Sequence, residues 1–162
     1  MARYTATIAT PRGIDEVFEY LSDFSRTLEW DPGVVEAQRL DDGPIGQGSE
    51  FRIVSEFLGR RTSLLYRIVE FDPPRMVSFR GVNSTVVSLD RLTFENFGGG
   101  TLVSYDAELT LKGPFRVADP LLALAFSRLG DRALNGLRDA LSRESSEDPP
   151  LQPQVERLSA AS

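Results

Sequence analysis

Two polar residues in a strand-like segment are the strongest candidates for chemistry in this sequence. Ser88 and Asp90 alternate with apolar neighbours in a stretch that continues to Leu92 and Phe94. If the two apolar residues face the interior, Ser88 and Asp90 do as well, whereas a shift of one residue places Arg91 there instead. A carboxylate removed from water has a raised pKa and can act as an acid or a base. Asp90 is therefore a candidate catalytic residue, the alternative being that this strand end reaches solvent.

Tyr105 is the second candidate catalytic residue. It shares a period of two with Val103 and Ala107, so its ring is expected to lie inside the molecule. A buried hydroxyl needs a partner, which would be another side chain, water or a ligand carbonyl. Simple core packing is the alternative. Tyr66 is a comparable candidate for a buried hydroxyl. Its neighbours do not alternate cleanly, however, so the sequence does not show whether its side chain points inward or outward.

The residue types that are missing limit the chemistry. The chain has no histidine and no cysteine, which excludes a thiolate nucleophile, a disulfide framework and a zinc–sulfur site. A cyclase or dehydratase needs a general base and a donor to the enolate oxygen. Because histidine, the usual general base, is absent, a carboxylate, a tyrosine or an arginine-assisted water would have to act as the base. We expect no cofactor and no metal.

Two glycine-rich stretches do not indicate nucleotide binding. Gly98-Gly99-Gly100 lacks the lysine and the helix that follow a phosphate-binding loop, and a hairpin turn with positive φ explains it. Gly46-Gln47-Gly48 leads into a strand instead of a helix, so a dinucleotide site is excluded as well. No serine-hydrolase elbow motif is present.

Length and charge predict one domain with few macromolecular partners. The 162 residues, 41% of them hydrophobic, suffice for one domain at residues 1–143, and the proline- and acid-rich stretch 144–162 is typical of a disordered tail. The net charge is −6 and the arginines are scattered, so we expect no nucleic-acid partner. We find no signal peptide and no apolar run long enough to span a membrane. We expect a cytoplasmic monomer or homodimer.

The elements that position the candidates follow from hydrophobic periodicity. Strand patterns cover residues 3–9, 34–40, 50–57, 62–71, 76–80, 85–97 and 101–111. Helical patterns cover a segment that begins with Thr10 as N-cap and Pro11, a short segment 24–28, and a long segment that ends near Arg143 and is either continuous or broken near Pro120. The strand at 50–57 has one apolar and one mostly charged face, which is typical of an antiparallel sheet.

Four residues outside the strands bear on a pocket. Trp30, in the loop 29–33, either plugs one end of the core or caps the mouth of a pocket. Asp31 beside it is interpreted as a turn-forming residue. Gly130 and Gly136 weaken the long helix by roughly 1 kcal/mol each relative to alanine, which indicates close packing or space left for a ligand.

Four motifs, in this order along the chain, resemble a known superfamily. They are Trp30-Asp31-Pro32-Gly33-Val34, Gly46-Gln47-Gly48-Ser49-Glu50-Phe51, Glu70-Phe71-Asp72-Pro73-Pro74-Arg75 and Gly98-Gly99-Gly100-Thr101-Leu102-Val103-Ser104-Tyr105. With the order of the elements, they are similar to the START-like, helix-grip (SRPBCC) superfamily, most closely its bacterial polyketide cyclase/dehydrase-type branch. The resemblance implies an α+β fold: a curved antiparallel sheet of about seven strands, wrapped around a long C-terminal helix and enclosing a hydrophobic cavity. Members use this cavity for lipids, sterols, polyketides and other apolar molecules, but the resemblance implies no particular reaction.

The leading hypothesis is therefore binding of a small hydrophobic or amphipathic molecule between the sheet and the C-terminal helix. One alternative is a cofactor-independent cyclase, aromatase or dehydratase, and another is an interaction module whose cavity is collapsed. The predicted ligand-binding residues are Phe51, Ile53, Phe57, Tyr66, Ser88, Asp90, Val103, Tyr105, Ala107, Leu122, Phe126 and Leu129.

Overall fold

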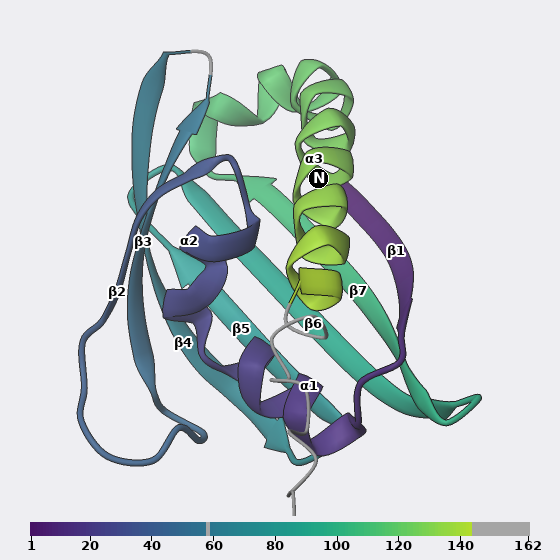
Figure 1. The fold of residues 1–162 in the computed structure, drawn as a ribbon. Helices are drawn as coiled ribbons and strands as arrows, with labels where there is room; N and C mark the ends of the chain where they lie inside the picture. Colours follow the sequence, from purple (N-terminus) through teal and green to yellow (C-terminus); the bar gives the residue numbers. More distant parts are fainter. Residues whose placement is uncertain (58, 144–162) are drawn as a thin grey trace, which may run out of the picture.

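One curved antiparallel sheet forms most of the molecule, and the helices lie on its concave side (Figure 1). The computed structural model describes residues 1–57 and 59–143, apart from the side chains of residues 57, 117–122, 124 and 143. The predicted tail at 144–162 lies outside the described residues. The predicted α+β fold, with a sheet curled around the C-terminal helix, is confirmed.

The sheet has the strand order β1-β7-β6-β5-β4-β3-β2, with antiparallel pairing throughout. The strands are β1 Ala2–Thr10, β2 Val34–Arg39, β3 Glu50–Phe57, β4 Arg60–Asp72, β5 Met76–Val82, β6 Val86–Phe97 and β7 Gly100–Leu111. The helices are α1 Ile14–Ser22, α2 Thr27–Trp30 and α3 Asp119–Arg143, with two 3₁₀ helices at Phe24–Arg26 and Gly113–Ala118.

Alternation along the strands places the core on the concave face. In β3, Phe51 and Ile53 are buried whereas Arg52 between them is exposed, as the period of two predicts. The core continues through β5 with Val77 and Phe79, neither of which has any exposed surface. The convex face of the sheet is therefore the wet face, and the helices bury the other one.

The triple glycine forms the hairpin between β6 and β7, as predicted. Gly98 and Gly99 have φ values of 55° and 83°, and two consecutive positive φ values are what a tight hairpin turn requires. A Cβ on Gly100 would lie 2.1 Å from the carbonyl oxygen of Thr10. A side chain at this position would therefore push β1 away from β7.

The predicted start of the first helix was wrong. Thr10 is not an N-cap, because β1 continues to this residue and pairs it with Thr101. Helix α1 begins at Ile14 with Gly13 as N-cap, and the hydroxyl of Thr10 accepts a bond from the backbone N–H of Arg12 instead. Pairing along the whole of β1 thus overrides the local capping signal.

Helix α3 crosses the concave face and packs by close backbone approach. It begins at Asp119, so the break expected near Pro120 is the change from the 3₁₀ helix to α3, and the proline stands in the first turn where its missing N–H is tolerated. A Cβ on Gly130 would lie 2.5 Å from the ring of Tyr4, and one on Gly136 would lie 1.8 Å from the carbonyl oxygen of Trp30. Both glycines therefore serve close packing.

Candidate ligand-binding site

A cavity of about 260 Å³ lies between the concave face of the sheet and α3. Its wall takes residues from β1, β2, β3, β4, β6 and β7, from α2 and the loop that follows it, and from α3. Most of this wall is apolar or aromatic, and its polar side chains include Tyr66, Ser88, Asp90 and Tyr105. The space is of a kind that suits a small apolar molecule with a few polar groups.

Strand β6 directs Asp90 inward and Arg91 outward. Ser88 and Asp90 are 3% and 5% exposed, and both line the cavity. Arg91 lies on the convex face, where its guanidinium donates to a carboxylate oxygen of Glu70 at 2.6 Å and to Ser78 Oγ at 3.2 Å. Of the two facings that the sequence left open, the structure therefore has the one that buries Asp90.

Two hydroxyl groups hold the Asp90 carboxylate. The Tyr105 hydroxyl donates to Asp90 Oδ1 at 2.5 Å, and the Ser88 hydroxyl donates to Oδ2 at 2.8 Å. The strand register brings these groups together, because Asp90 pairs with Ala107, which is two residues from Tyr105 on β7. The two oxygens of a carboxylate offer about four sites for hydrogen-bond donors. The Tyr66 hydroxyl acts on Asp90 as a third donor.

Tyr66 reaches the same polar group from β4 because its neighbour has no side chain. It pairs across the sheet with Gly81 of β5, whose Cβ, if present, would lie 2.5 Å from the Tyr66 ring. Gly81 in turn pairs with Ser88. The missing side chain therefore lets the ring lie over the sheet, and Tyr66 is close enough to Asp90 for the two to interact electrostatically.

Burial controls the protonation of this group. It raises the pKa of Asp90 to about 6, although the hydrogen bonds from Tyr105 and Ser88 act in the opposite direction. Burial, together with the nearby Asp90 carboxylate, also raises the pKa values of Tyr66 and Tyr105 well above their ordinary value. At neutral pH the arrangement is therefore an ionised carboxylate among neutral hydroxyls, which can accept a proton or orient a ligand donor.

Asp31 is a second carboxyl on the cavity wall, and it is partly buried. Its Oδ1 accepts a 2.8 Å bond from the backbone N–H of Gly33, which agrees with the predicted turn-forming role. It also lines the cavity, and burial raises its pKa. The negative charge of Asp31 also contributes to the raised pKa of Asp90. The local sequence around Asp31 predicts the turn but not the place of its carboxyl on the cavity wall.

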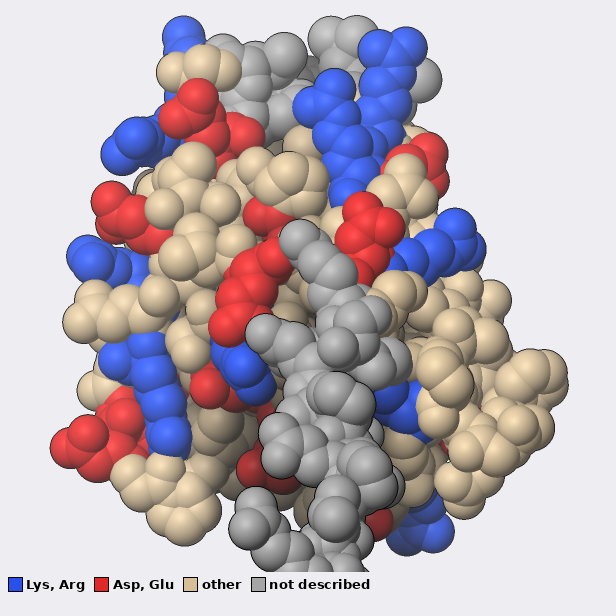
Figure 2. Space-filling view, in the orientation of Figure 1, with Lys and Arg blue, Asp and Glu red and all other residues tan. Residues whose placement is uncertain are grey.

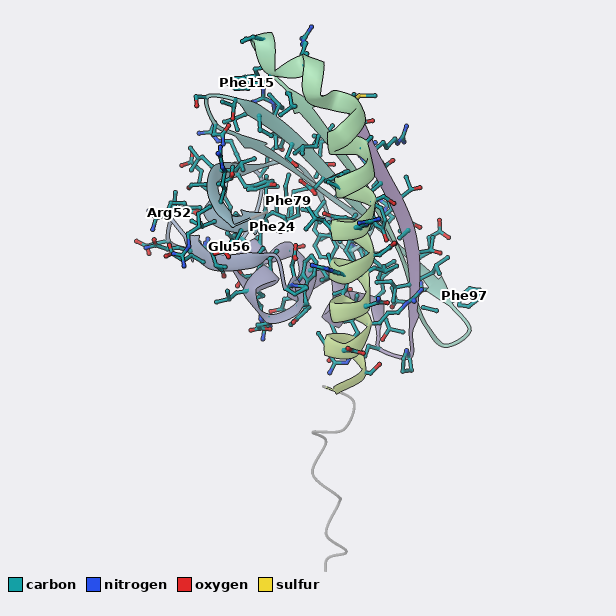
Figure 3. All side chains as sticks on the ribbon, turned by 90° about the horizontal axis from the view of Figure 1, so that it is seen from above. Phe24, Arg52, Glu56, Phe79, Phe97 and Phe115 are labelled. Atoms are coloured by element: carbon teal, nitrogen blue, oxygen red, sulfur yellow. The ribbon has the colours of Figure 1, made fainter. Side chains whose placement is uncertain are left out.

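Phe24 and Trp30, which are not among the predicted ligand-binding residues, also line the cavity. Phe24 stacks on Phe79 with ring centroids 4.2 Å apart and meets Tyr66 edge-on at 4.9 Å. Figure 3 shows Phe24 and Phe79 together inside the curved sheet. Trp30 is 7% exposed and packs in the core, which agrees with the first of its two predicted roles, and it also lines the cavity. The only sequence signal for Phe24 was its place in a short helix.

The predicted ligand-binding residues fall into three groups. Those that line the cavity are Ile53, Tyr66, Ser88, Asp90, Tyr105, Ala107, Phe126 and Leu129. Phe51 and Val103 lie instead in the packed core, have no exposed surface and are not part of the cavity wall. The side chains of Phe57 and Leu122 lie outside the described residues.

The described residues show neither a metal site nor a membrane-spanning helix. Within 1–57 and 59–143, no group of three or more Asp or Glu side chains is placed to hold a metal ion. In the same part of the chain, no helix is long and apolar enough to cross a membrane.

The curved sheet around α3, with a cavity between them, is the START-like, helix-grip fold. The model of one protein family, described as polyketide cyclase / dehydrase and lipid transport, matches residues 1–142. The chain belongs to this family. No curated protein matches it significantly.

Solved structures share the fold at low sequence identity. A START superfamily protein from Mycobacterium smegmatis is 15% identical, with a TM-score of 0.74 over 89% of this chain and 99% of that one. The Zhui aromatase/cyclase from a Streptomyces species is 16% identical, with a TM-score of 0.73 over 88% of this chain and 94% of that one. A STAR-related lipid transfer protein from Xanthomonas axonopodis is 13% identical, with a TM-score of 0.66 over 86% and 85%. At these identities the likeness extends to the fold alone.

Proposed function

We propose that this protein binds a small hydrophobic or amphipathic molecule in the cavity between the sheet and α3. The observation that carries the proposal is the cavity itself, about 260 Å³ of space with an apolar, aromatic wall and a polar group at Asp90. Family membership supports it, since the family description includes lipid transport. The open cavity also argues against an interaction module with a collapsed interior.

The most direct variant fills the cavity. Ala107 is buried on β7 and lines the cavity, so Ala107→Trp places a large ring in the space that the ligand would occupy. We expect the wild-type protein to bind decanol, an uncharged amphipathic probe, and Ala107→Trp to lose at least about tenfold in affinity, a difference of about 1.4 kcal/mol. Isothermal titration calorimetry measures both.

Leu65→Trp is the matched control for this variant. Leu65 is 42% exposed, next to the cavity-lining Tyr66 on β4, so the same ring is added outside the cavity. Its affinity for decanol should equal that of the wild type. If Ala107→Trp folds, as judged by circular dichroism, and still binds decanol with full affinity, the ligand does not occupy this cavity.

A second candidate function is a cofactor-independent cyclase, aromatase or dehydratase. The specific observation in its favour is Asp90, a buried carboxylate with a pKa of about 6, close to the value that suits a general base near neutral pH. Asp90 would remove a proton next to a carbonyl, and a tyrosine hydroxyl at the same site would donate to the resulting enolate oxygen. One solved structure with this fold is an aromatase/cyclase.

Binding and catalysis are separated by Asp90→Asn, which keeps the shape of the side chain and removes the base. An enzyme of this kind would lose turnover of a poly-β-ketone substrate, followed by product chromatography, while the affinity for that substrate changes little. Turnover that survives the substitution would remove Asp90 as the base, and the absence of turnover in the wild type would leave binding as the function.

A further inference from the structure

All charged side chains that line the cavity carry the same sign. Among the described residues of the wall these are Asp31, Glu56 and Asp90, and no arginine or lysine is among them. Glu56 is exposed and has a cationic partner, because Arg61 Nε lies 3.4 Å from its Oε2. The two carboxylates that matter inside the cavity are therefore Asp31 and Asp90.

Neither the buried Asp90 nor the partly buried Asp31 has a cationic partner in the described part of the chain. Asp90 accepts bonds from the hydroxyls of Tyr105 and Ser88, and Asp31 accepts one from the backbone N–H of Gly33. These bonds stabilise the carboxylates but supply no positive charge. A buried charge is normally paired, because the loss of its hydration is otherwise uncompensated.

The walls around these carboxylates are aromatic. Phe24, Trp30, Tyr66 and Tyr105 line the same cavity as Asp31 and Asp90. The faces of aromatic rings carry partial negative charge and attract cations. Both the ring faces and the carboxylates therefore favour a positively charged ligand group and oppose a negatively charged one.

The charged side chains on the cavity wall are all acidic, whereas the surface around the cavity carries charges of both signs. Arg128 and Arg132 line a neighbouring hollow that shares Gly33, Glu56 and Leu129 with the cavity wall, but both arginines are exposed and neither lines the cavity. The face drawn in Figure 2 carries acidic and basic side chains side by side. Solvent and salt screen these outer charges far more than the buried ones.

We propose that the ligand of this cavity is an amphipathic molecule with a protonated amine, whose ammonium group pairs with Asp90 while its apolar part lies against the aromatic wall. The inference rests on the proposed binding function and specifies its ligand class. With about four acceptor sites and three hydroxyl partners, the Asp90 carboxylate can still accept an ammonium proton. Such a charge-assisted hydrogen bond is stronger than that of an alcohol.

Three probes of matched length test this inference: decylamine, decanol and decanoate. They share an unbranched ten-carbon skeleton and differ in the charge of the end group, which is positive, neutral and negative respectively. Calorimetric titration of the wild-type protein at neutral pH should show that decylamine binds at least about tenfold more tightly than decanol. Decanoate should bind most weakly of the three. Trp30, the only tryptophan, lines the cavity and supplies a second signal through its fluorescence.

The variant Asp90→Asn should reduce the difference between the affinities for decylamine and decanol, because its amide carries no charge and only Asp31 still favours the ammonium group. Asp42→Asn, at an exposed position outside the cavity, should leave the difference unchanged. The wild-type series decides the question even if Asp90→Asn does not fold.

The other possible results of the three-probe titration contradict either the amine inference alone or the proposed binding function as well. Decanol binding without any preference for decylamine overturns the amine inference and leaves the proposed binding function standing. A preference for decanoate would overturn the inference too and point to Arg128 and Arg132 at the neighbouring hollow as the charges that act on the ligand. Binding of none of the three probes would contradict the proposed function, and the inference would fall with it.

Discussion

Asp90 combines deep burial with partners that are all hydroxyl groups. Tyr105 and Ser88 donate to its two oxygens, and Tyr66 lies nearby on β4. This arrangement gives the carboxylate a defined position without neutralising its charge. A group of this kind is costly to ionise in the folded protein, and the cost has a measurable dependence on pH.

The first residue-scale prediction is a loss of stability with rising pH that depends on Asp90. Its folded-state pKa is raised from 3.8 to about 6, so the folded protein holds this proton more tightly than the unfolded chain does. The stability that Asp90 contributes is therefore greatest below about pH 4 and is lost as the pH rises through about 6. Relative to Asp90→Asn, the wild-type free energy of unfolding should fall by about 2 kcal/mol between about pH 4 and about pH 7. Urea unfolding of both proteins at a series of pH values measures this change in the free energy of unfolding.

The difference between the two proteins is the quantity to follow, because other carboxyls titrate over the same range. The pKa of Asp31 is also raised, whereas those of Asp41 and Glu70 are lowered, and all three are common to both proteins. Asp42→Asn is the control and should run parallel to the wild type. Parallel curves for the wild type and Asp90→Asn would show that Asp90 does not titrate as described.

The second residue-scale prediction concerns the hydroxyl that faces Asp90. The bond from Tyr105 stabilises the charged carboxylate, so Tyr105→Phe should raise the pKa of Asp90 further above about 6. Tyr20→Phe is the control, since the Tyr20 hydroxyl donates to Glu29 instead. NMR titration of the Asp90 carboxyl carbon measures both variants. An unchanged or lower pKa in Tyr105→Phe would be inconsistent with the hydrogen bond described.

The sequence allowed Asp90 and Tyr105 to be selected but not their pairing. Alternation along β6 offered two facings, and only the register with β5 and β7 decides between Asp90 and Arg91. Asp31 could be assigned a turn from its local motif, whereas its position on the cavity wall depends on how α2 packs against α3. Local patterns name candidate residues, and long-range packing brings them together.

At the scale of elements, α3 is held by contacts that a side chain would prevent. A Cβ on Gly136 would lie 1.8 Å from the carbonyl oxygen of Trp30, and this obstacle is backbone, which cannot rotate away. The same contact fixes the end of α2 and thereby the Trp30 and Asp31 side chains at the cavity. The packing of α3 and the shape of the cavity are therefore linked.

The element-scale prediction is that Gly136→Ala destabilises the protein. Alanine favours a helix over glycine by roughly 1 kcal/mol, so a surface position would gain stability from this change. Here we expect a net loss of about 1 to 3 kcal/mol from overpacking against α2. Asn135→Ala, at the exposed neighbouring position, should stay within about 0.5 kcal/mol of the wild type. A gain in stability for Gly136→Ala, measured by urea unfolding, would show that α3 and α2 do not approach this closely.

The elements themselves were more predictable than their ends. Strand patterns bounded by turn residues predicted all seven strands, although the strand that contains Tyr66 does not alternate cleanly. The start of α1 was wrong, since Thr10 is a good N-cap in isolation but pairs with Thr101 in the sheet. The glycines of α3 indicated close packing or space, and only the fold identifies Tyr4 and Trp30 as the groups they approach.

At the scale of the whole molecule, the fold explains why a cavity exists at all. A strongly curved sheet and a single long helix cannot fill the space between them with the side chains that line it, and about 260 Å³ stays open. The sequence predicted this architecture through its resemblance to the START-like superfamily. It could not give the sign of the cavity charge, which depends on which acidic side chains of β6 and the α2 loop turn inward.

The most direct test of the central claim, that this cavity holds a small hydrophobic or amphipathic molecule, is native mass spectrometry. The measurement compares the freshly purified protein with the same protein after incubation with decanol. We predict a discrete additional mass in at least the second sample that disappears on denaturation, and organic extraction of the first sample would identify any molecule already bound. A mass equal to that of the bare chain in both samples would contradict the claim.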